Sequence, residues 1–229
     1  TSIFRARPLP PVNWAATIYH GLPRDTLTFN AGKREGYLAF LGRISPEKRP
    51  DRAIEIAVKS GMRLKIAAKI DRADECYWRE RIAPLIHAHP NVEYVGEISE
   101  QEKNAFLGNA SALLFPIDWD EPFGLVMIEA MACGTPVIAY SRGSVPEVID
   151  HGQSGFIVSS IDEAVRAVAA VPILDRAHVR HIFERRFTVE RMTRDYLALY
   201  RRQIAARAII DFPVATAPIA STQGKALAV

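Results

Sequence analysis

Short apolar runs alternate with amphipathic stretches along the chain from Tyr37 onward. The runs YLAFLG, RLKIAAK, NVEYVG, SALLFPI, TPVIAY and SGFIVSS predict short strands. The stretches between them, such as DRAIEIAVKSG and GLVMIEAMACG, carry apolar residues at helical spacing and close on glycine. Strands that alternate with helices predict repeated βαβ units and a parallel sheet covered on both faces. Because such crossovers are right-handed, the predicted fold class is α/β, with a doubly wound, Rossmann-like parallel sheet.

Local signals refine this pattern. Ser99 followed by Glu102, and Ser144 followed by Glu147, each have the spacing of a capping box and predict the start of a helix. Pro84 interrupts the helical stretch ADECYWRERIAPLIHAH, where we expect a kink or a break.

The two ends of the chain differ from this regular part. Residues 1–36 are proline-rich and irregular, and within them ATIYHGLP predicts one short strand followed by a turn. The helical pattern continues to about residue 207, whereas residues 208–229 are rich in Ala, Pro and Thr without periodicity and predict a flexible tail. We therefore expect one regular domain over residues 37–207.

Composition excludes several classes of protein. The 229 residues are 48% hydrophobic and 24% charged, which is enough apolar material for a large core. A formal net charge of +3 is too weak to favour a nucleic-acid partner. The two cysteines lack metal-like spacing and are typical of free thiols in a reducing cytoplasm. No apolar run reaches the ~20 residues of a membrane span, and the first residues lack a signal-peptide layout.

Candidate chemistry lies in the loops after the strands, because open parallel sheets bind ligands beyond the carboxyl ends of their strands. In GRISPEKRPD, Arg43 and Lys48 belong to the same loop. A planar guanidinium and a mobile ammonium suit a phosphate or a diphosphate. A solvated basic loop is the alternative, since Arg49 and Arg52 are also present.

A second loop, DWDEPFG, leads into the helix GLVMIEAMACG. The backbone N–H groups near Phe123, Gly124 and Leu125 form an anion site together with the helix dipole. Glu121 precedes this helix and is expected in the same cleft. Glu129 lies about one and a half turns inside the helix, where a buried and unpaired carboxylate is unfavourable. It therefore needs a partner, either a cation across the sheet or a ligand with hydroxyl groups.

A third loop, SRGSVPE, brings Gly143 and another helix start to the same edge, although capping alone accounts for Ser144 and Glu147. Together the loops offer two cations, a helix N-terminus and two carboxylates. Cations and amide donors bind a diphosphate, and carboxylates accept hydrogen bonds from the hydroxyls of a ribose or a sugar. The implied ligand is a nucleoside diphosphate sugar.

The motifs GRISPEK, EPFGLVMIEAMACGTPVIA and GSVPEVIDHGQSGFIV together closely resemble the C-terminal, donor-binding domain of retaining glycosyltransferases of family 4. The resemblance runs from Ala16 to Tyr200 and includes the Glu-x(seven)-Glu element and the Arg-to-Lys spacing of the phosphate loop. It implies one half of the two-Rossmann-domain GT-B fold. Residues 1–36 would then be the end of the acceptor domain and the interdomain linker, with most of that domain missing.

The resemblance implies catalytic roles for three residues. Arg43 and Lys48 would hold the diphosphate, and Glu121 would contact the transferred sugar. The sugar would pass with retention at the anomeric carbon from a UDP-, GDP- or ADP-sugar to a sugar or lipid acceptor. The catalytic His of the family would come from the missing domain, so His20 is interpreted as a linker residue.

Further contacts with the donor follow from the same resemblance. The backbone at Phe123, Gly124 and Leu125 would face the sugar and phosphates, and Glu129 would accept hydrogen bonds from the ribose. The loop from Gly96 to Ile98 would lie against the base. The motifs do not distinguish the base, the sugar, the acceptor or the linkage. The full enzyme would be cytoplasmic, with peripheral association at the inner face of the membrane.

Other interpretations compete. Asp118 and Asp120 match the D-x-D metal motif of a different glycosyltransferase fold, but they adjoin the helix start assigned to phosphate, so we expect no metal and no cofactor. A nicotinamide-dependent oxidoreductase fails because no G-x-G-x-x-G follows the strand at Tyr37. A non-catalytic nucleotide-sugar-binding module remains the alternative. As a donor half alone, the chain is expected to be inactive.

Overall fold

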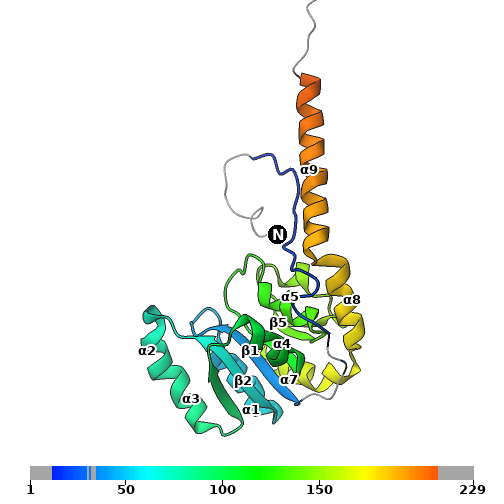
Figure 1. Ribbon diagram of the computed structural model, residues 1–229. Coiled ribbons are helices and arrows are strands. Elements are labelled where there is room, and N and C mark those ends of the chain that lie inside the picture. Colours follow the sequence, from blue (N-terminus) through cyan, green and yellow to red (C-terminus); the bar gives the residue numbers. More distant parts are fainter. Residues whose placement is uncertain (1–11, 30, 32–34, 211–229) are drawn as a thin grey trace, which may run out of the picture.

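The computed structural model describes residues 12–29, 31 and 35–210, and within them the chain forms a parallel sheet with helices on both faces (Figure 1). The strands are β1 (Tyr37–Arg43), β2 (Arg63–Lys69), β3 (Val92–Gly96), β4 (Ala110–Phe115), β5 (Val137–Tyr140) and β6 (Gly155–Val158). They pair in the order β3-β2-β1-β4-β5-β6, all in parallel. This order confirms the doubly wound, Rossmann-like fold.

Side chains from the sheet enter two cores, one on each face. Successive residues of a strand point to opposite faces. In β1, Tyr37 and Ala39 join one core, whereas Leu38 and Phe40 join the other. The first core includes residues of α4 (Glu100–Gly108), α5 (Leu125–Ala132), α6 (Val145–Val148) and α8 (Arg176–Arg186); the second includes residues of α1 (Pro50–Ser60) and α7 (Ile161–Ala170). Burial on both faces explains why the strands are continuous apolar runs.

The helical stretch around Pro84 is irregular but continuous from residue 75 to residue 88, where a kink or a break was expected. The turns η2 (Arg72–Asp74) and α2 (Glu75–Tyr77) lead into a π-helical turn, η3 (Trp78–Ile82), which precedes α3 (Ala83–Ala88). Pro84 lies at the start of α3, directly after the π turn. Single π turns of this kind are the usual form in which π-helix occurs inside α-helices.

Of the two predicted capping boxes, the structure forms the one at Ser99 but not the one at Ser144. Glu102 accepts a hydrogen bond from the backbone N–H of Ser99 at 2.7 Å, which confirms the capping box of α4. The capping box at Ser144 is wrong, because Ser144 Oγ donates to the carbonyl of Phe123 at 2.8 Å. The carboxylate of Glu147 instead accepts from the hydroxyl of Tyr19 at 2.9 Å.

The predicted strand in ATIYHGLP is also wrong. Within the described part of this segment, only Leu22 forms a β-bridge, and its partner is Thr188. The N–H of Leu22 donates to Phe187 at 2.9 Å, and the N–H of Val189 donates to Leu22 at 2.9 Å. The segment is tied to the end of α8 and the start of α9 rather than to the sheet.

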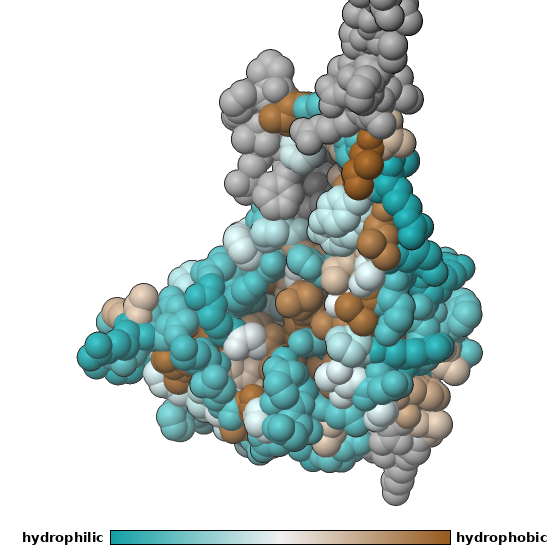
Figure 2. Space-filling model, turned by 45° about the horizontal axis from the view of Figure 1, so that its top comes forward, coloured by the Kyte–Doolittle hydropathy of each residue, from teal (hydrophilic) through white to brown (hydrophobic). Residues whose placement is uncertain are grey.

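The last helix, α9 (Val189–Ile210), follows η4 (Val171–Ile173) and α8 and rises away from the body of the molecule (Figure 1). Exposed apolar side chains lie along it, at Tyr196, Leu197, Tyr200 and Ile204. Figure 2 shows hydrophobic surface on this helix and in a hollow at the centre of the same face. None of the described helices combines the length and apolar character that a membrane span requires.

The boundaries of the predicted domain stay a prediction. Residues 1–11 and 211–229, which hold part of the proposed linker segment and most of the proposed tail, lie outside the described residues. Residues 208–210 belong to α9 rather than to a tail. The strand order reverses between β1 and β4, so the chain leaves these neighbouring strands toward opposite faces and opens a crevice between them.

Candidate active site

A pocket of about 370 Å³ lies in this crevice, beyond the carboxyl ends of β1 and β4. It is lined by His20, Lys48, Glu121 and residues 122–126, together with side chains from the strands. We call it the α5 pocket, because the start of α5 forms its wall. The structure therefore brings Lys48, Glu121 and the predicted backbone donors together.

Lys48 and Glu121 form an ion pair in the α5 pocket. Lys48 Nζ donates to Glu121 Oε2 at 2.6 Å, and the two side chains are only 18% and 11% exposed. The ammonium also lies 4.8 Å from the ring centre of Trp119, within cation–π range. Removing one partner of such a largely buried pair would leave an uncompensated charge in the pocket, which is strongly destabilising.

The start of α5 is shaped by glycine. Gly124 precedes the helix with φ +78°, and a Cβ there would lie 2.7 Å from the end of the Met127 side chain. A side chain would therefore be strained and crowded at this position. Phe123, Gly124 and Leu125 all line the pocket, so the positive end of the helix dipole faces it.

The loop after β5 holds this segment in place. The N–H of Ser144 donates to the carbonyl of Glu121 at 2.9 Å, and its hydroxyl binds the carbonyl of Phe123. Gly143 has φ +54° and packs so closely against the backbone of Glu121 that a Cβ would overlap it. The loop SRGSVPE thus positions the acidic loop rather than capping a helix.

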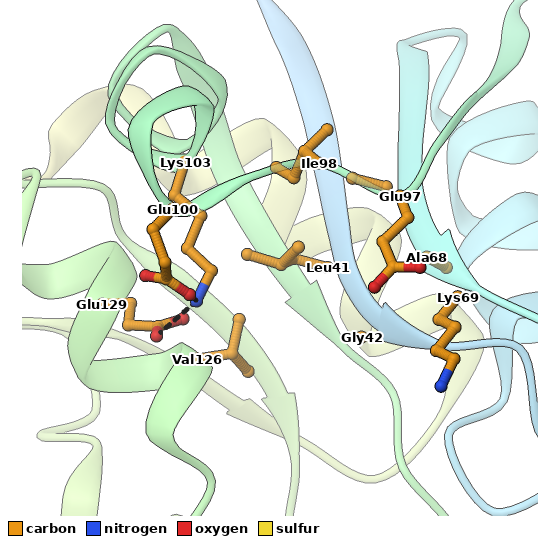
Figure 3. A pocket seen from close by; sticks show the side chains of 11 residues that line it. Leu41, Gly42, Ala68, Lys69, Glu97, Ile98, Glu100, Lys103, Val126 and Glu129 are labelled. Carbon is orange, nitrogen blue, oxygen red and sulfur yellow. Dashed lines mark hydrogen bonds and ion pairs between the residues drawn. The ribbon is translucent and has the colours of Figure 1, made fainter.

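A second pocket of about 310 Å³ adjoins the first, and Leu41, Gly42 and Val126 line both. We call it the α4 pocket, because Lys103 of α4 enters it. Figure 3 shows Lys103 between Glu100 and Glu129, with the carboxylate of Glu97 across the pocket. Glu129 is thus one pocket away from Glu121.

Lys103 is the partner that Glu129 was expected to need. Its Nζ lies 3.0 Å from Glu129 Oε1 and 2.6 Å from Glu100 Oε1, and the side chains of Lys103 and Glu129 are 17% and 14% exposed. Burial acts to lower the pKa of Lys103, but hydrogen bonds to Glu100 and Glu129 outweigh it, so the pKa is raised. Glu129 therefore faces a cation and also lines the pocket, and its contact with a ribose hydroxyl stays a prediction.

The loop after β3 forms the far wall of the α4 pocket. Glu97 and Ile98 line it, together with Lys69 from the end of β2 (Figure 3). Gly96 ends β3 with φ +84°, so its part in the loop is to turn the chain. The predicted segment from Gly96 to Ile98 is thus at the crevice, and its contact with a base stays a prediction.

Arg43 is the predicted site residue whose side chain points away from both pockets. Its guanidinium lies 3.1 Å from Glu47 and 3.5 Å from Asp71, and the side chain is half exposed. Exposed ion pairs of this kind contribute about 0–1 kcal/mol each, so little free energy holds Arg43 in this orientation. Its contact with a diphosphate stays a prediction.

The carboxylate of Asp118 in the DWD motif is bound by arginines. Among the described residues, Arg49, Arg52 and Arg142 contact it at 3.1, 3.0 and 3.1 Å. Burial acts to raise the pKa of Asp118, but the charges of Arg52, Arg142 and Arg49 outweigh it and lower the pKa. The residue anchors the loop that leads to Glu121, and its oxygens already have cationic partners.

Lys103 and His20 are among the pocket residues that the sequence did not reveal. Lys103 stands in the first turn of α4, and the capping box SEQE already placed that turn at the carboxyl edge of the sheet. His20 was interpreted as a linker residue, yet its ring lies edge-on to Phe123 with centroids 4.9 Å apart and lines the α5 pocket. No periodicity marks a loop residue such as His20, so only the fold reveals its position.

Comparisons with known proteins agree with this geometry. The family model for glycosyl transferases group 1 matches residues 25–178. The D-inositol 3-phosphate glycosyltransferases of Mycobacterium tuberculosis and Mycobacterium bovis are each 32% identical to the chain over 207 residues. The alignments cover 83% of this chain and 40% of those proteins, so the chain spans less than half the length of these relatives.

Solved structures share the fold. AviGT4, a glycosyltransferase involved in avilamycin A biosynthesis, matches with a TM-score of 0.70 at 25% identity, over 82% of this chain and 57% of that chain. Sucrose-phosphate synthase from Thermosynechococcus elongatus matches with a TM-score of 0.71 at 23% identity, over 82% and 52%. Anabaena HepE, solved in complex with UDP-glucose, matches with a TM-score of 0.69 at 18% identity, over 82% and 57%. The latter two likenesses show the fold alone.

Proposed function

The chain belongs to the glycosyl transferases group 1 family, and on this premise we propose that it is the donor-binding half of a sugar-transferring enzyme. The donor would be a nucleoside diphosphate sugar, and the acceptor would carry a hydroxyl group. Anabaena HepE, which shares the fold, has been solved with UDP and with UDP-glucose, which supports a donor of this class.

The observation that carries the proposal is the arrangement of two lysine–carboxylate pairs in adjoining pockets. Lys48 and Glu121 lie beside the start of α5, and Lys103 and Glu129 lie in the next pocket. A diphosphate over the start of α5 would place its nucleoside in the α4 pocket, with the ribose at Glu129. Its sugar would then reach Glu121.

Electrostatics would drive the loss of the leaving group. Lys48 and the start of α5 would stabilise negative charge as it develops on the diphosphate, which is the kind of preorganised field that contributes most to many enzymes. Arg43 would exchange Glu47 and Asp71 for the diphosphate, since those exposed ion pairs are weak.

The proposed transfer retains the configuration at the anomeric carbon, as in family 4. The bond between that carbon and the diphosphate oxygen breaks, and the acceptor oxygen bonds to the carbon on the same face. The departing phosphate oxygen takes the acceptor's proton. Glu121 would position a sugar hydroxyl rather than act as a nucleophile, because its carboxylate is bound by Lys48 at 2.6 Å.

No metal is needed in this proposal. Asp118 is bound by arginines, and the positive charge for the diphosphate comes from Lys48, Arg43 and the helix dipole. The acceptor would be bound by a second domain, reached through residues 1–36. The exposed apolar residues of α9 are the surface that such a domain would cover.

Calorimetric titration tests the proposal with UDP, GDP and ADP and their monophosphates, in the presence of EDTA. We expect one diphosphate to bind about tenfold or more tightly than its monophosphate, since a charge-assisted bond contributes about 1.5–3 kcal/mol. Lys48→Met should remove most of this preference. Lys59→Met is the matched control, because Lys59 pairs with Glu55 on an exposed face of α1. Equal affinities, or a strict need for magnesium or manganese, would contradict the proposal.

The alternative is a nucleotide-sugar-binding module without catalysis. It predicts the same titrations but no turnover when the remaining domain is supplied. Turnover by a two-domain protein, lost in the Lys48→Met variant, would decide for the enzyme.

A further inference from the structure

His20 stands in the α5 pocket although it comes from the segment that precedes the sheet. Its ring lies edge-on to Phe123, with centroids 4.9 Å apart and an angle of 79° between the planes. The same pocket holds Lys48, Glu121 and the start of α5. An imidazole thus lines the pocket in which the proposed diphosphate would lie.

The backbone around His20 is fixed by the C-terminal helices. Arg191 Nη2 in α9 donates to the carbonyls of Tyr19 at 2.8 Å and of His20 at 3.0 Å. On the next residue, Gly21 packs against the backbone of Thr188, and a Cβ there would overlap it. The bridge of Leu22 to Thr188 completes the anchorage. The backbone is thus held at Tyr19, His20, Gly21 and Leu22, which fixes the position of the His20 side chain in the pocket.

We propose that His20 is a donor-contacting residue that gives an imidazole N–H hydrogen bond to the terminal phosphate of the diphosphate. The inference rests on the proposed function, and it assigns His20 to the phosphate joined to the sugar. The charges that face the ring in the pocket are Lys48 and Glu121, and Glu121 is already bound by Lys48. The start of α5 adds positive potential, so an anion is the ligand that completes this set.

Two substitutions separate hydrogen bonding from packing. His20→Phe keeps an aromatic ring against Phe123 but has no N–H donor. His20→Gln keeps a donor and loses the ring. By calorimetry on the chain as it is, His20→Phe should lower the affinity for the best nucleoside diphosphate about tenfold and leave its monophosphate unchanged. His20→Gln should stay within about threefold of the wild type for both.

A second test loosens the backbone at His20 by removing its hydrogen bonds to Arg191. Arg191 is a positioning residue, so Arg191→Met should weaken diphosphate binding in the same direction and leave monophosphate binding unchanged. Thermal unfolding of each variant checks that it folds, and His20→Leu replaces His20→Phe if the latter does not. Because the His20 side chain is exposed, neither His20→Phe nor His20→Leu creates a buried cavity.

The outcomes are distinguishable from failure of the proposed function. If the wild-type chain binds no nucleoside diphosphate, the proposed function falls and this inference falls with it. If the wild type binds and His20→Phe binds equally well, or loses both ligands alike, only the role of His20 is overturned. A loss seen with the nucleoside diphosphate sugar and not with the diphosphate would place His20 on the sugar and also overturn the assignment.

Discussion

Two lysines, Lys48 from the loop after β1 and Lys103 from α4, form ion pairs with the crevice carboxylates. From the sequence, Glu129 had either a structural cation or a ligand as its partner, and these alternatives stood side by side. The structure shows the cation, Lys103, at a wall that also faces a pocket. The two alternatives are therefore compatible, because a carboxylate offers about four acceptor positions and one lysine uses one of them. Composition and spacing could reveal the acid but not which lysine faces it.

Substitution of Glu129 should change nucleotide affinity, whereas substitution of Glu121 should change turnover. Glu129→Gln should weaken nucleotide binding about tenfold to a hundredfold, because a charge-assisted bond from the ribose contributes about 1.5–3 kcal/mol. Glu121→Gln should leave nucleotide affinity within about threefold and lower turnover in a two-domain enzyme. Calorimetry and product assays on both variants measure this, with Glu93→Gln on the exposed part of β3 as the control. The reverse pattern would mean that the roles of Glu121 and Glu129 are exchanged.

At the scale of elements, the start of α5 depends on one backbone conformation. The sequence indicated a glycine that lets an anion approach the helix, and the structure adds a conformational reason, φ +78° at Gly124. The loops that hold this start were less predictable. The third loop was assigned to capping from a local motif, whereas Ser144 binds carbonyls more than twenty residues earlier in the chain. Local motifs describe contacts near in sequence, and a sheet edge collects contacts distant in sequence.

Two glycine variants separate strain from site geometry. Gly124→Ala and Gly61→Ala both place a side chain in the left-handed region, which costs about 1–2 kcal/mol of stability. Nothing lies within 4 Å of a Cβ at Gly61, whereas one at Gly124 would meet Met127 and Phe115. Gly124→Ala should therefore destabilise more and also weaken diphosphate binding, which Gly61→Ala leaves unchanged. Urea unfolding and calorimetry test this, and equal diphosphate affinities in the two variants would argue against an anion site at α5.

Acid should weaken the attachment between the N-terminal segment and α8. Hydrogen bonding from Arg24 leads the effects that hold the pKa of Glu184 down to about 2, and Arg180 adds to it against burial. A carboxyl with a lowered folded pKa stabilises the fold above its unfolded pKa of ~4.3 and loses that contribution as pH falls toward the folded value. The free energy of unfolding should thus fall between about pH 4.3 and pH 2, and Glu184→Gln should flatten this fall. An unchanged slope in the variant would show that Glu184 contributes nothing to it.

At the scale of the whole molecule, the sheet domain and the N-terminal segment differed in how far they could be predicted. The doubly wound parallel sheet with helices on both faces was predictable, because the apolar periodicity of strands and helices repeats along the chain, whereas the strand order came only from the structure. The placement of residues 12–29 was not predictable, since these residues lack periodicity and their contacts lie with α8 and α9 near the other end of the described chain. The position of His20 on the α5 pocket could not be predicted for this reason.

We expect the chain alone to transfer no sugar. Closure of a cleft between two domains assembles the reacting groups in enzymes of this kind. We expect at most trace hydrolysis when the chain is incubated with a labelled donor and a panel of sugar and lipid acceptors. Addition of a second domain that covers Tyr196, Leu197, Tyr200 and Ile204 should restore turnover. Robust transfer by the chain with no other polypeptide would show that the acceptor site is built from these residues.

The bridge between Leu22 and Thr188 affects how the segment between these two residues can be transferred to another protein. Leu22 precedes the sheet and Thr188 follows α8. A segment cut from the chain at these two residues would therefore have its two ends next to each other. Ends that are already adjacent can be sealed by a short peptide or spliced into a surface loop of a host at little entropic penalty. The segment from Leu22 to Thr188 is therefore suited to transfer into a host protein, together with every described lining residue of the two pockets except His20.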